Sequence, residues 1–226
     1  ARAEDRAALA EQSGGAAAVL ARQVVENGGC AYGAAFTAPT TVKLVRIDAP
    51  AQLSRLQGSK YVHAATGSAY RKVQADLKAG RQVLFTGTPC QVAGLYAYLG
   101  SDPPGLTTCD LVCHGVPEAD TLNAYLQTEL NPAAIARLTF RDGDGWVMKA
   151  YDRDGVVLRR MDLKNSLYYN GFMEGYLYRS GCYTCPYATE KRVADLTLGD
   201  FWGIGEETPY PNAAAELKKG LSLILV

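Results

Sequence analysis

The chain has 226 residues, of which 48% are hydrophobic and 20% are charged, enough apolar material for one sizeable core or two small ones. Lys+Arg and Asp+Glu number 23 each, so the net charge is zero and nothing indicates the basic surface of a nucleic-acid-binding protein. No run of 18 apolar residues predicts a transmembrane helix, and the apolar stretch near the N-terminus is too short for a secretion signal.

The first 80 residues combine helix-type patterns with two strand candidates. Ser13 is a plausible N-cap, and paired glycines end the helix that follows it. In chain order the patterns predict a short helix over 2–11, a second helix over 15–27, strands at 30–36 and 41–48, a helical turn at 49–57, and a helix at 68–80.

Strands and helices then alternate, which indicates α/β architecture with at least partly parallel pairing. The patterns predict strand 81–86, helix 89–99, strand 106–112, helix 118–130, three antiparallel strands within 134–162, an aromatic helix or loop at 165–180, and a strand within 193–203. We therefore expect an α/β fold with α+β character in the second half. It would have a mixed, partly parallel sheet flanked by helices, a β-rich meander and a cysteine loop, in one domain over 1–226.

Six cysteines are present, although a chain with this core does not need disulfides. The absence of a secretion signal favours reduced thiols and a cytoplasmic location. In that setting the C-x-x-C pair Cys182 and Cys185 is more often a metal or redox site.

Two further cysteines, Cys90 and Cys113, are predicted at the carboxyl ends of two strands. Open α/β sheets place their ligands at that edge. If the strands are neighbours and the C-x-x-C loop folds over them, four sulfurs surround one centre. Spacing alone leaves structural zinc and an iron–sulfur cluster equally open, since both use four cysteines. Cys30 and Cys109 are expected to be small buried hydrophobes.

Seven motifs then occur in a characteristic order: SGG (13–15), GSKY (58–61), VLFTGTPCQVAGL (83–95), DLVCHGVP (110–117), FRDGDGW (140–146), CYTC (182–185) and RVADLTLGDFWGI (192–204). Together they resemble the beta subunit family of the deazaflavin (coenzyme F420) hydrogenases and dehydrogenases. That family also includes the hydroxymethyl-chlorophyll reductase of plants. The resemblance covers nearly the whole chain.

The resemblance implies a flavoprotein that carries FAD and a 4Fe-4S cluster. Such a protein passes electrons between a reduced carrier, such as deazaflavin or ferredoxin, and an organic substrate or partner. The implied cluster ligands are Cys90, Cys113, Cys182 and Cys185. Many relatives also carry an N-terminal ferredoxin-like segment, which this sequence lacks, and His63 stands where Gln is common.

The expected flavin-binding residues lie in three stretches. The helix start at residues 13–15 could bind the pyrophosphate of FAD, although a helix start of this kind is as often an ordinary cap. Lys60 could pair with a phosphate or with reduced flavin, and His114 is expected to hydrogen-bond near the cluster or to act as an acid; both are candidate catalytic residues. The cofactor-binding candidates are Ser13, Gly14, Gly15, Ser59, Lys60, Thr86, Gly87, Thr88 and Gln91.

Three functions follow, in order of preference. The first is an enzyme in which the flavin performs two-electron chemistry and the cluster passes single electrons to a partner. The second is a non-catalytic electron-transfer or assembly subunit. The third is a structural Cys₄ zinc domain. Neither a G-x-G-x-x-G fingerprint nor a P-loop is present, so NAD(P)H as a direct donor has no support.

Overall fold

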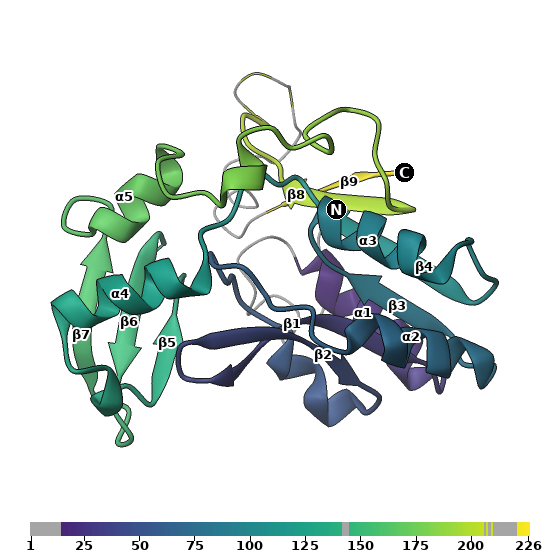
Figure 1. The fold of residues 1–226 in the computed structure, drawn as a ribbon, viewed down its shortest axis with the longest axis horizontal. Coiled ribbons are helices and arrows are strands. Elements are labelled where there is room, and N and C mark those ends of the chain that lie inside the picture. The colour runs from purple at the N-terminus through teal and green to yellow at the C-terminus, as the bar shows by residue number, and fades with distance from the viewer. Residues whose placement is uncertain (1–14, 142–144, 206, 208, 210–220) are drawn as a thin grey trace.

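A computed structural model describes residues 15–141, 145–205, 207, 209 and 221–226 (Figure 1). The helix expected over 2–11 and the candidates Ser13 and Gly14 lie outside the described residues. The helix expected from residue 15 is α1 (Ala16–Glu26), and its N-cap is Gly15 at φ 73° instead of Ser13. Glycine adopts this left-handed conformation at no steric cost, because it has no Cβ.

The larger sheet has six strands in the order β2-β1-β3-β4-β8-β9. Its four central strands pair in parallel, while β2 and β9 pair antiparallel at the two edges. The expected mixed, partly parallel sheet is therefore confirmed. The strands are β1 (Cys30–Ala38), β2 (Thr41–Ile47), β3 (Val83–Thr86), β4 (Leu106–Leu111), β8 (Leu196–Asp200) and β9 (Ser222–Leu225).

Helices cover both faces of this sheet, and alternate strand residues point to opposite faces. Leu84 packs with α1 and η1 (Pro50–Arg55), whereas its neighbours Val83 and Phe85 pack with α2 (Ala69–Lys78) and α3 (Pro89–Leu99). The buried central strands therefore read as nearly continuous apolar runs, as expected for parallel strands covered on both faces.

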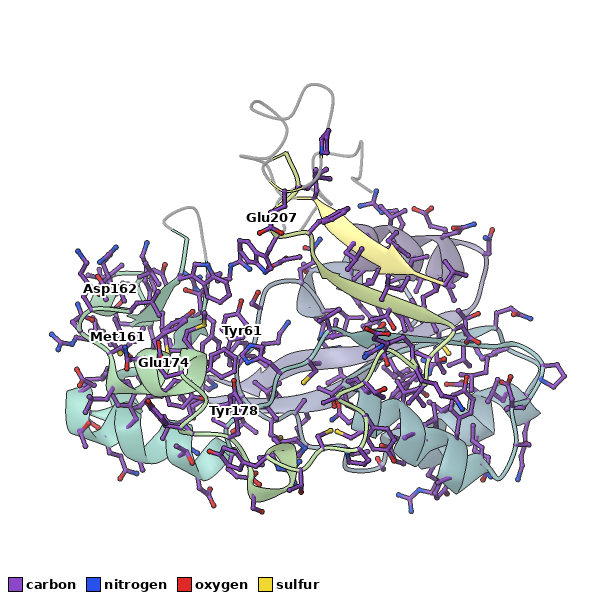
Figure 2. All side chains as sticks on the ribbon, turned by 90° about the horizontal axis from the view of Figure 1, so that it is seen from above. Tyr61, Met161, Asp162, Glu174, Tyr178 and Glu207 are labelled. Carbon is purple, nitrogen blue, oxygen red and sulfur yellow. The ribbon has the colours of Figure 1, made fainter. Side chains whose placement is uncertain are left out.

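The expected antiparallel meander forms a separate three-stranded sheet of β5 (Arg137–Thr139), β6 (Val147–Tyr151) and β7 (Val157–Asp162). With α4 (Ala119–Glu129) and α5 (Leu167–Met173) it forms the left part of Figure 1. One hydrophobic cluster contains buried residues of both sheets, among them Phe85 and Met148. Tyr61 lies between the two parts in Figure 2. Its ring contacts those of Phe140, which follows β5, and of Tyr169 and Phe172 in α5.

Two short 3₁₀ turns complete the elements, η2 (Pro132–Ala134) and η3 (Ser180–Cys182). The sequence patterns did not predict β9, which pairs with β8 from Thr197↔Leu225 to Asp200↔Ser222. Within the described part of the chain, no helix is both long enough and apolar enough to cross a membrane.

Candidate functional site

Parallel strands β3 and β4 are direct neighbours, as the cysteine argument required. Thr86, the last residue of β3, is paired with Cys109, and the Gly87 N–H donates to the Cys109 carbonyl at 3.1 Å. Cys90 follows β3 in the first turn of α3, and Cys113 lies two residues beyond β4. Both strands therefore end at the same edge of the sheet, and each is followed within a few residues by a cysteine.

The start of α3 fixes the backbone around Cys90. Thr88 is the N-cap, Pro89 occupies the first turn, and Gln91 completes a capping box with Thr88. The Cys90 side chain is exposed, and its Sγ lies 3.1 Å from Thr88 Oγ1. The first-turn N–H groups of a helix favour negative charge, so this position suits a thiolate ligand.

The C-x-x-C loop lies against the segment that follows Cys113. The Arg179 N–H donates to the Val116 carbonyl at 2.9 Å, and the Arg179 guanidinium donates to Glu118 at 2.6 Å. The turn η3 then begins at Ser180, and the Cys182 N–H donates to the Arg179 carbonyl at 2.8 Å. These contacts bring the loop to the sheet edge that carries Cys113.

The Cys113 thiol is within electrostatic range of the other three candidate ligands. Burial raises the pKa of the Cys113 thiol, and Cys90, Cys182 and Cys185 raise it further, while a hydrogen bond from the Gly115 backbone lowers it. Such coupling extends beyond coordination distance: over the described ranges, no three His, Cys, Asp or Glu side chains are close enough to hold a metal ion. Four half-buried or exposed thiols from three segments nevertheless fit the donor set of a Cys₄ group.

His114 contacts aromatic side chains beside these cysteines. Its Nδ1 is hydrogen-bonded to the Tyr178 hydroxyl, and its ring centroid lies 4.8 Å from that of Phe172. Burial lowers the pKa of His114. Tyr178 in turn occupies the space over Gly115, where an added Cβ would lie 2.5 Å from the ring. The loop after Cys113 is thus packed directly onto the segment before the C-x-x-C pair.

Two residues expected to contact flavin make several hydrogen bonds within the protein. The Lys60 ammonium donates to the carbonyls of Leu56, Gln57 and Gly58 at 3.1, 2.7 and 2.9 Å. Gln91 is buried, accepts from the Thr88 N–H at 3.1 Å and donates to the Ala64 carbonyl at 2.8 Å. Both side chains therefore stabilise the loops at this edge of the sheet.

The other flavin candidates that the structure describes lie close to these loops. Thr86, Gly87 and Thr88 form the connection from β3 to α3, and Ser59 shares a side-chain hydrogen bond with Tyr61. At Gly87 a Cβ would meet Gln91 and Phe85 at 3.1–3.2 Å, so the backbone there is closely packed by its own neighbours. Gly15 begins α1.

An arginine and several aromatic rings form a further group that the sequence did not assign. Arg141 pairs with Asp200 at 3.1 Å, and its guanidinium lies 4.5 Å above the Trp146 ring. The Trp146 ring also stacks with the rings of Tyr61 and Trp202, with centroids at 5.3 and 6.3 Å. Trp202 is 68% exposed, so it does not fill the core. The motifs FRDGDGW and LGDFWGI gave the only sequence signal for this group.

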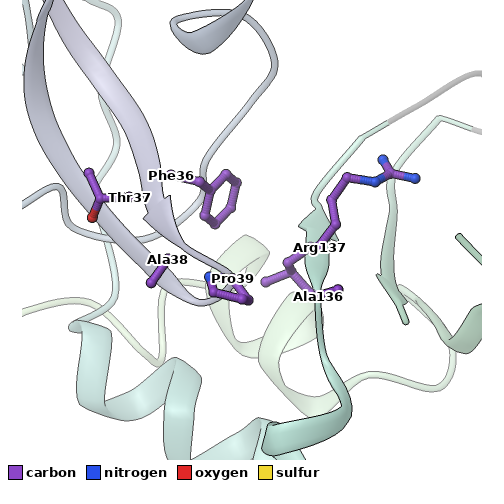
Figure 3. A pocket seen from close by; sticks show the side chains of 7 residues that line it. Phe36, Thr37, Ala38, Pro39, Ala136 and Arg137 are labelled. Carbon is purple, nitrogen blue, oxygen red and sulfur yellow. The ribbon is translucent and has the colours of Figure 1, made fainter. Parts of the chain in front are cut away.

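Cys30 and Cys109 are buried, as expected of small hydrophobic cysteines. Burial raises the pKa of each thiol to about 12. A shallow pocket of about 260 Å³ lies elsewhere, between the β1–β2 turn and β5, and is lined by Phe36, Thr37, Ala38, Pro39, Ala136, Arg137 and Leu138 (Figure 3). None of the candidate site residues lines it.

The fold and this site define a mixed α/β protein that brings four cysteines to the carboxyl edge of its parallel strands. A family model for the C-terminal part of the beta subunit of coenzyme F420 hydrogenase/dehydrogenase matches residues 80–226, and the chain belongs to this family. The resemblance inferred from the seven motifs is thereby confirmed.

Among solved structures, the chain is similar to one chain of the F420-reducing [NiFe] hydrogenase complex from Methanosarcina barkeri. The identity is 20% and the TM-score 0.61, and the match covers 99% of this chain and 79% of that chain. This likeness shows a shared fold. No curated protein matches the sequence.

Proposed function

We propose that this protein is a flavin- and 4Fe-4S-dependent oxidoreductase. It would pass electrons between a reduced carrier of the deazaflavin or ferredoxin type and an organic substrate or partner protein. The observation that carries the proposal is geometric: Cys90 and Cys113 follow the neighbouring parallel strands β3 and β4, and the segment before Cys182 and Cys185 is hydrogen-bonded to the segment after Cys113. Family membership supports a hydrogenase- or dehydrogenase-associated role.

We take residues 1–226 as one domain, because one hydrophobic cluster includes buried residues of both sheets.

Cys90, Cys113, Cys182 and Cys185 would hold the cluster, which when bound supplies single-electron transfer. The chain itself sets the surroundings of the sulfurs. The Gly115 N–H donates to the Cys113 sulfur, and the first turn of α3 presents its backbone N–H groups near Cys90. Hydrogen bonds to cluster sulfurs and partial burial both tune reduction potential.

FAD, when bound, supplies two-electron hydride chemistry. The residues that would hold it are those of the β3–α3 connection, together with Ser59 and the helix start at Gly15. The largely exposed Trp202, which stacks with Trp146, offers a further aromatic surface. Lys60 would reach a phosphate only by giving up its contacts to backbone carbonyls.

The test is to purify the chain without oxygen and to quantify iron, sulfide, zinc and flavin. We expect about four iron per chain, a broad absorption shoulder near ~400 nm that bleaches with dithionite, and flavin released on denaturation. One zinc per chain, with no iron and no colour, would overturn the redox proposal and leave the structural Cys₄ zinc domain.

The protein contacts of Lys60 and Gln91 favour a second candidate, an electron-transfer or assembly subunit that binds no flavin. The same purification separates the two candidates, because a protein of this second kind would contain iron and sulfide but no flavin. Reduction of an organic substrate by the flavin-loaded protein would exclude it.

A further inference from the structure

Asp110 is a buried carboxylate in β4, three residues before Cys113. Its side chain is fully buried, and its Oδ1 accepts from Arg192 at 3.1 Å and from the Thr197 hydroxyl at 2.5 Å. Its Oδ2 has no hydrogen-bond partner among the residues that the structure describes. Removing the cation from a buried ion pair of this kind is strongly destabilising.

Arg192 begins the segment that leads from the C-x-x-C loop into β8. Its guanidinium donates to four acceptors, which lie on three separate segments. Two acceptors are in β4, Asp110 Oδ1 at 3.1 Å and the Leu111 carbonyl at 3.0 Å. The third is Thr197 Oγ1 in β8, and the fourth is the Thr189 carbonyl in the loop, both at 3.0 Å.

A second contact reinforces the same junction. The Asp195 carboxylate accepts from the Thr108 N–H at 2.7 Å and from the Thr108 hydroxyl at 2.9 Å, while the Asp195 N–H donates back to that hydroxyl at 3.0 Å. Thr108 and Asp110 project to the same side of β4, as residues two apart on a strand do. The returning end of the cysteine loop is therefore attached to β4 twice.

We propose that Arg192 is a positioning residue that holds the C-x-x-C loop at a fixed place relative to Cys113. It does so by joining Thr189 of the loop to the strand that leads into Cys113, with buried Asp110 as its counter-ion. This inference adds a role to the proposed cluster site, but the geometry it describes belongs to the chain with or without a cluster.

The chemistry of the side chain explains why an arginine stands here. A guanidinium presents five N–H donors in a rigid plane, so one side chain can join acceptors on several segments. A lysine keeps the charge but has three donors around a single nitrogen. Arg192→Lys therefore separates a geometric role from a purely electrostatic one.

The experiment measures the proximity of Cys113 and Cys182 without any cluster. In the full chain carrying Cys90→Ser and Cys185→Ser, these are the two remaining thiols that are not buried. The metal-free protein is treated with dibromobimane, which bridges neighbouring thiols, and the Cys113–Cys182 cross-linked peptide is quantified by mass spectrometry. We expect Arg192→Gln to lower its yield at least threefold, and Arg192→Lys to lower it by a comparable factor.

The matched control is Arg46→Gln. Arg46 also pairs with a largely buried carboxylate, Asp76, at 2.7 Å, but on the α2 side of the sheet and away from the cysteine loop. We expect it to lower stability while leaving the cross-linking yield unchanged. Wild-type yield in Arg192→Gln, full rescue by Arg192→Lys, or an equal loss in Arg46→Gln would each overturn the inference.

A second readout uses the chain with all its cysteines after iron loading. Arg192→Gln is expected to release iron to a chelator at least threefold faster than wild type, and Arg46→Gln at the wild-type rate. If wild type takes up no iron, the proposed function fails, whereas the cross-linking result still decides the role of Arg192.

Discussion

At the scale of single residues, the environment of each cysteine separates two kinds of thiol. Cys30 and Cys109 are buried, and burial raises the pKa of each to about 12. Burial also raises the pKa of Cys113, so the feature that separates the two kinds of thiol is access from solvent: Cys30 and Cys109 are at most 1% exposed. Cys90, Cys113, Cys182 and Cys185 are exposed or half-buried at one edge of the sheet.

This division predicts opposite effects of two substitutions in the same stretch of chain. Cys113→Ala removes a proposed ligand, so iron content should fall from about four per chain to less than one. Cys109→Ala removes one buried sulfur and should leave iron content unchanged. Both proteins are compared by iron and sulfide analysis after oxygen-free purification. Equal loss in both variants, or retention of iron in Cys113→Ala, would contradict the assignment.

Asp76 on α2 organises a different polar network. Burial disfavours its charged form, but hydrogen bonds from Arg46, Tyr32 and Cys30 outweigh burial, so the pKa of Asp76 lies below its ordinary value. The stabilisation that this carboxylate contributes is therefore fully present above the ordinary pKa of about 4 and is lost as pH falls below it.

Asp76→Asn should lower the free energy of unfolding at pH 7 by about 3 kcal/mol, because it removes the more buried of the two carboxylates that pair with Arg46. The variant should also lose less stability than wild type when pH falls below about 4. Urea unfolding at a series of pH values measures both effects. Asp48→Asn, which removes an exposed partner of the same arginine, is the control and should change stability little. A wild-type pH profile in Asp76→Asn would refute the prediction.

At the scale of elements, one glycine permits the contact between two loops of the site. Gly115 has φ 128°, in a region that other residues rarely adopt, and the Tyr178 ring covers it. The loop after Cys113 and the segment before the C-x-x-C pair can approach this closely only without a Cβ at residue 115.

Gly115→Ala should therefore destabilise the protein by about 3 kcal/mol, from backbone strain and from the clash with Tyr178. It should also reduce iron uptake. Gly181→Ala is a suitable control, since this glycine lies beside Cys182, has no positive φ, and meets nothing within 4 Å of an added Cβ. Chemical unfolding and iron analysis are run on both variants. Similar behaviour of the two would show that Gly115 is not required for close packing.

At the scale of the whole molecule, residues far apart in sequence complete the larger sheet. β9 lies beside β8 at one edge, and the Phe201 N–H donates to the Leu221 carbonyl at 3.1 Å. β8 also pairs with β4, the strand that leads into Cys113. On this side of the sheet, β4 is therefore flanked by β8 and then by β9. Residues 222–225 thus pair the side of β8 that faces away from β4.

Deleting residues 222–226 should expose β8 as an edge strand. We expect a loss of about 3 kcal/mol in the free energy of unfolding, because several backbone hydrogen bonds of about 1 kcal/mol each disappear. Concentration-dependent association should also appear, since an unpaired edge invites pairing with another chain. Urea unfolding and sedimentation velocity test both. Deletion of the fully exposed Val226 alone is the control and should alter neither quantity; a monomeric, wild-type-stable 222–226 deletion would contradict the prediction.

The sequence alone determined the local elements wherever short-range chemistry is strong. Helix α3 occupies the predicted residues 89–99, because Thr88, Pro89 and Gln91 form a start signal and Gly100 adopts the left-handed conformation that ends it. The alternation of strands and helices gave the partly parallel sheet, and motif order gave the family. The C-x-x-C pair and two cysteines after strands were also visible without a structure.

Only the tertiary structure decided which distant groups meet. The pairs Arg192–Asp110 and Arg141–Asp200 join residues 82 and 59 positions apart, and no local pattern specifies such partners. Strand β9 has too few residues to show periodicity, and it forms because β8 offers an unpaired edge. Lys60 and Gln91 have side chains that could hold an anion or a flavin. The fold directs their donors to backbone carbonyls, because polar groups near the core must be satisfied by whatever lies within reach.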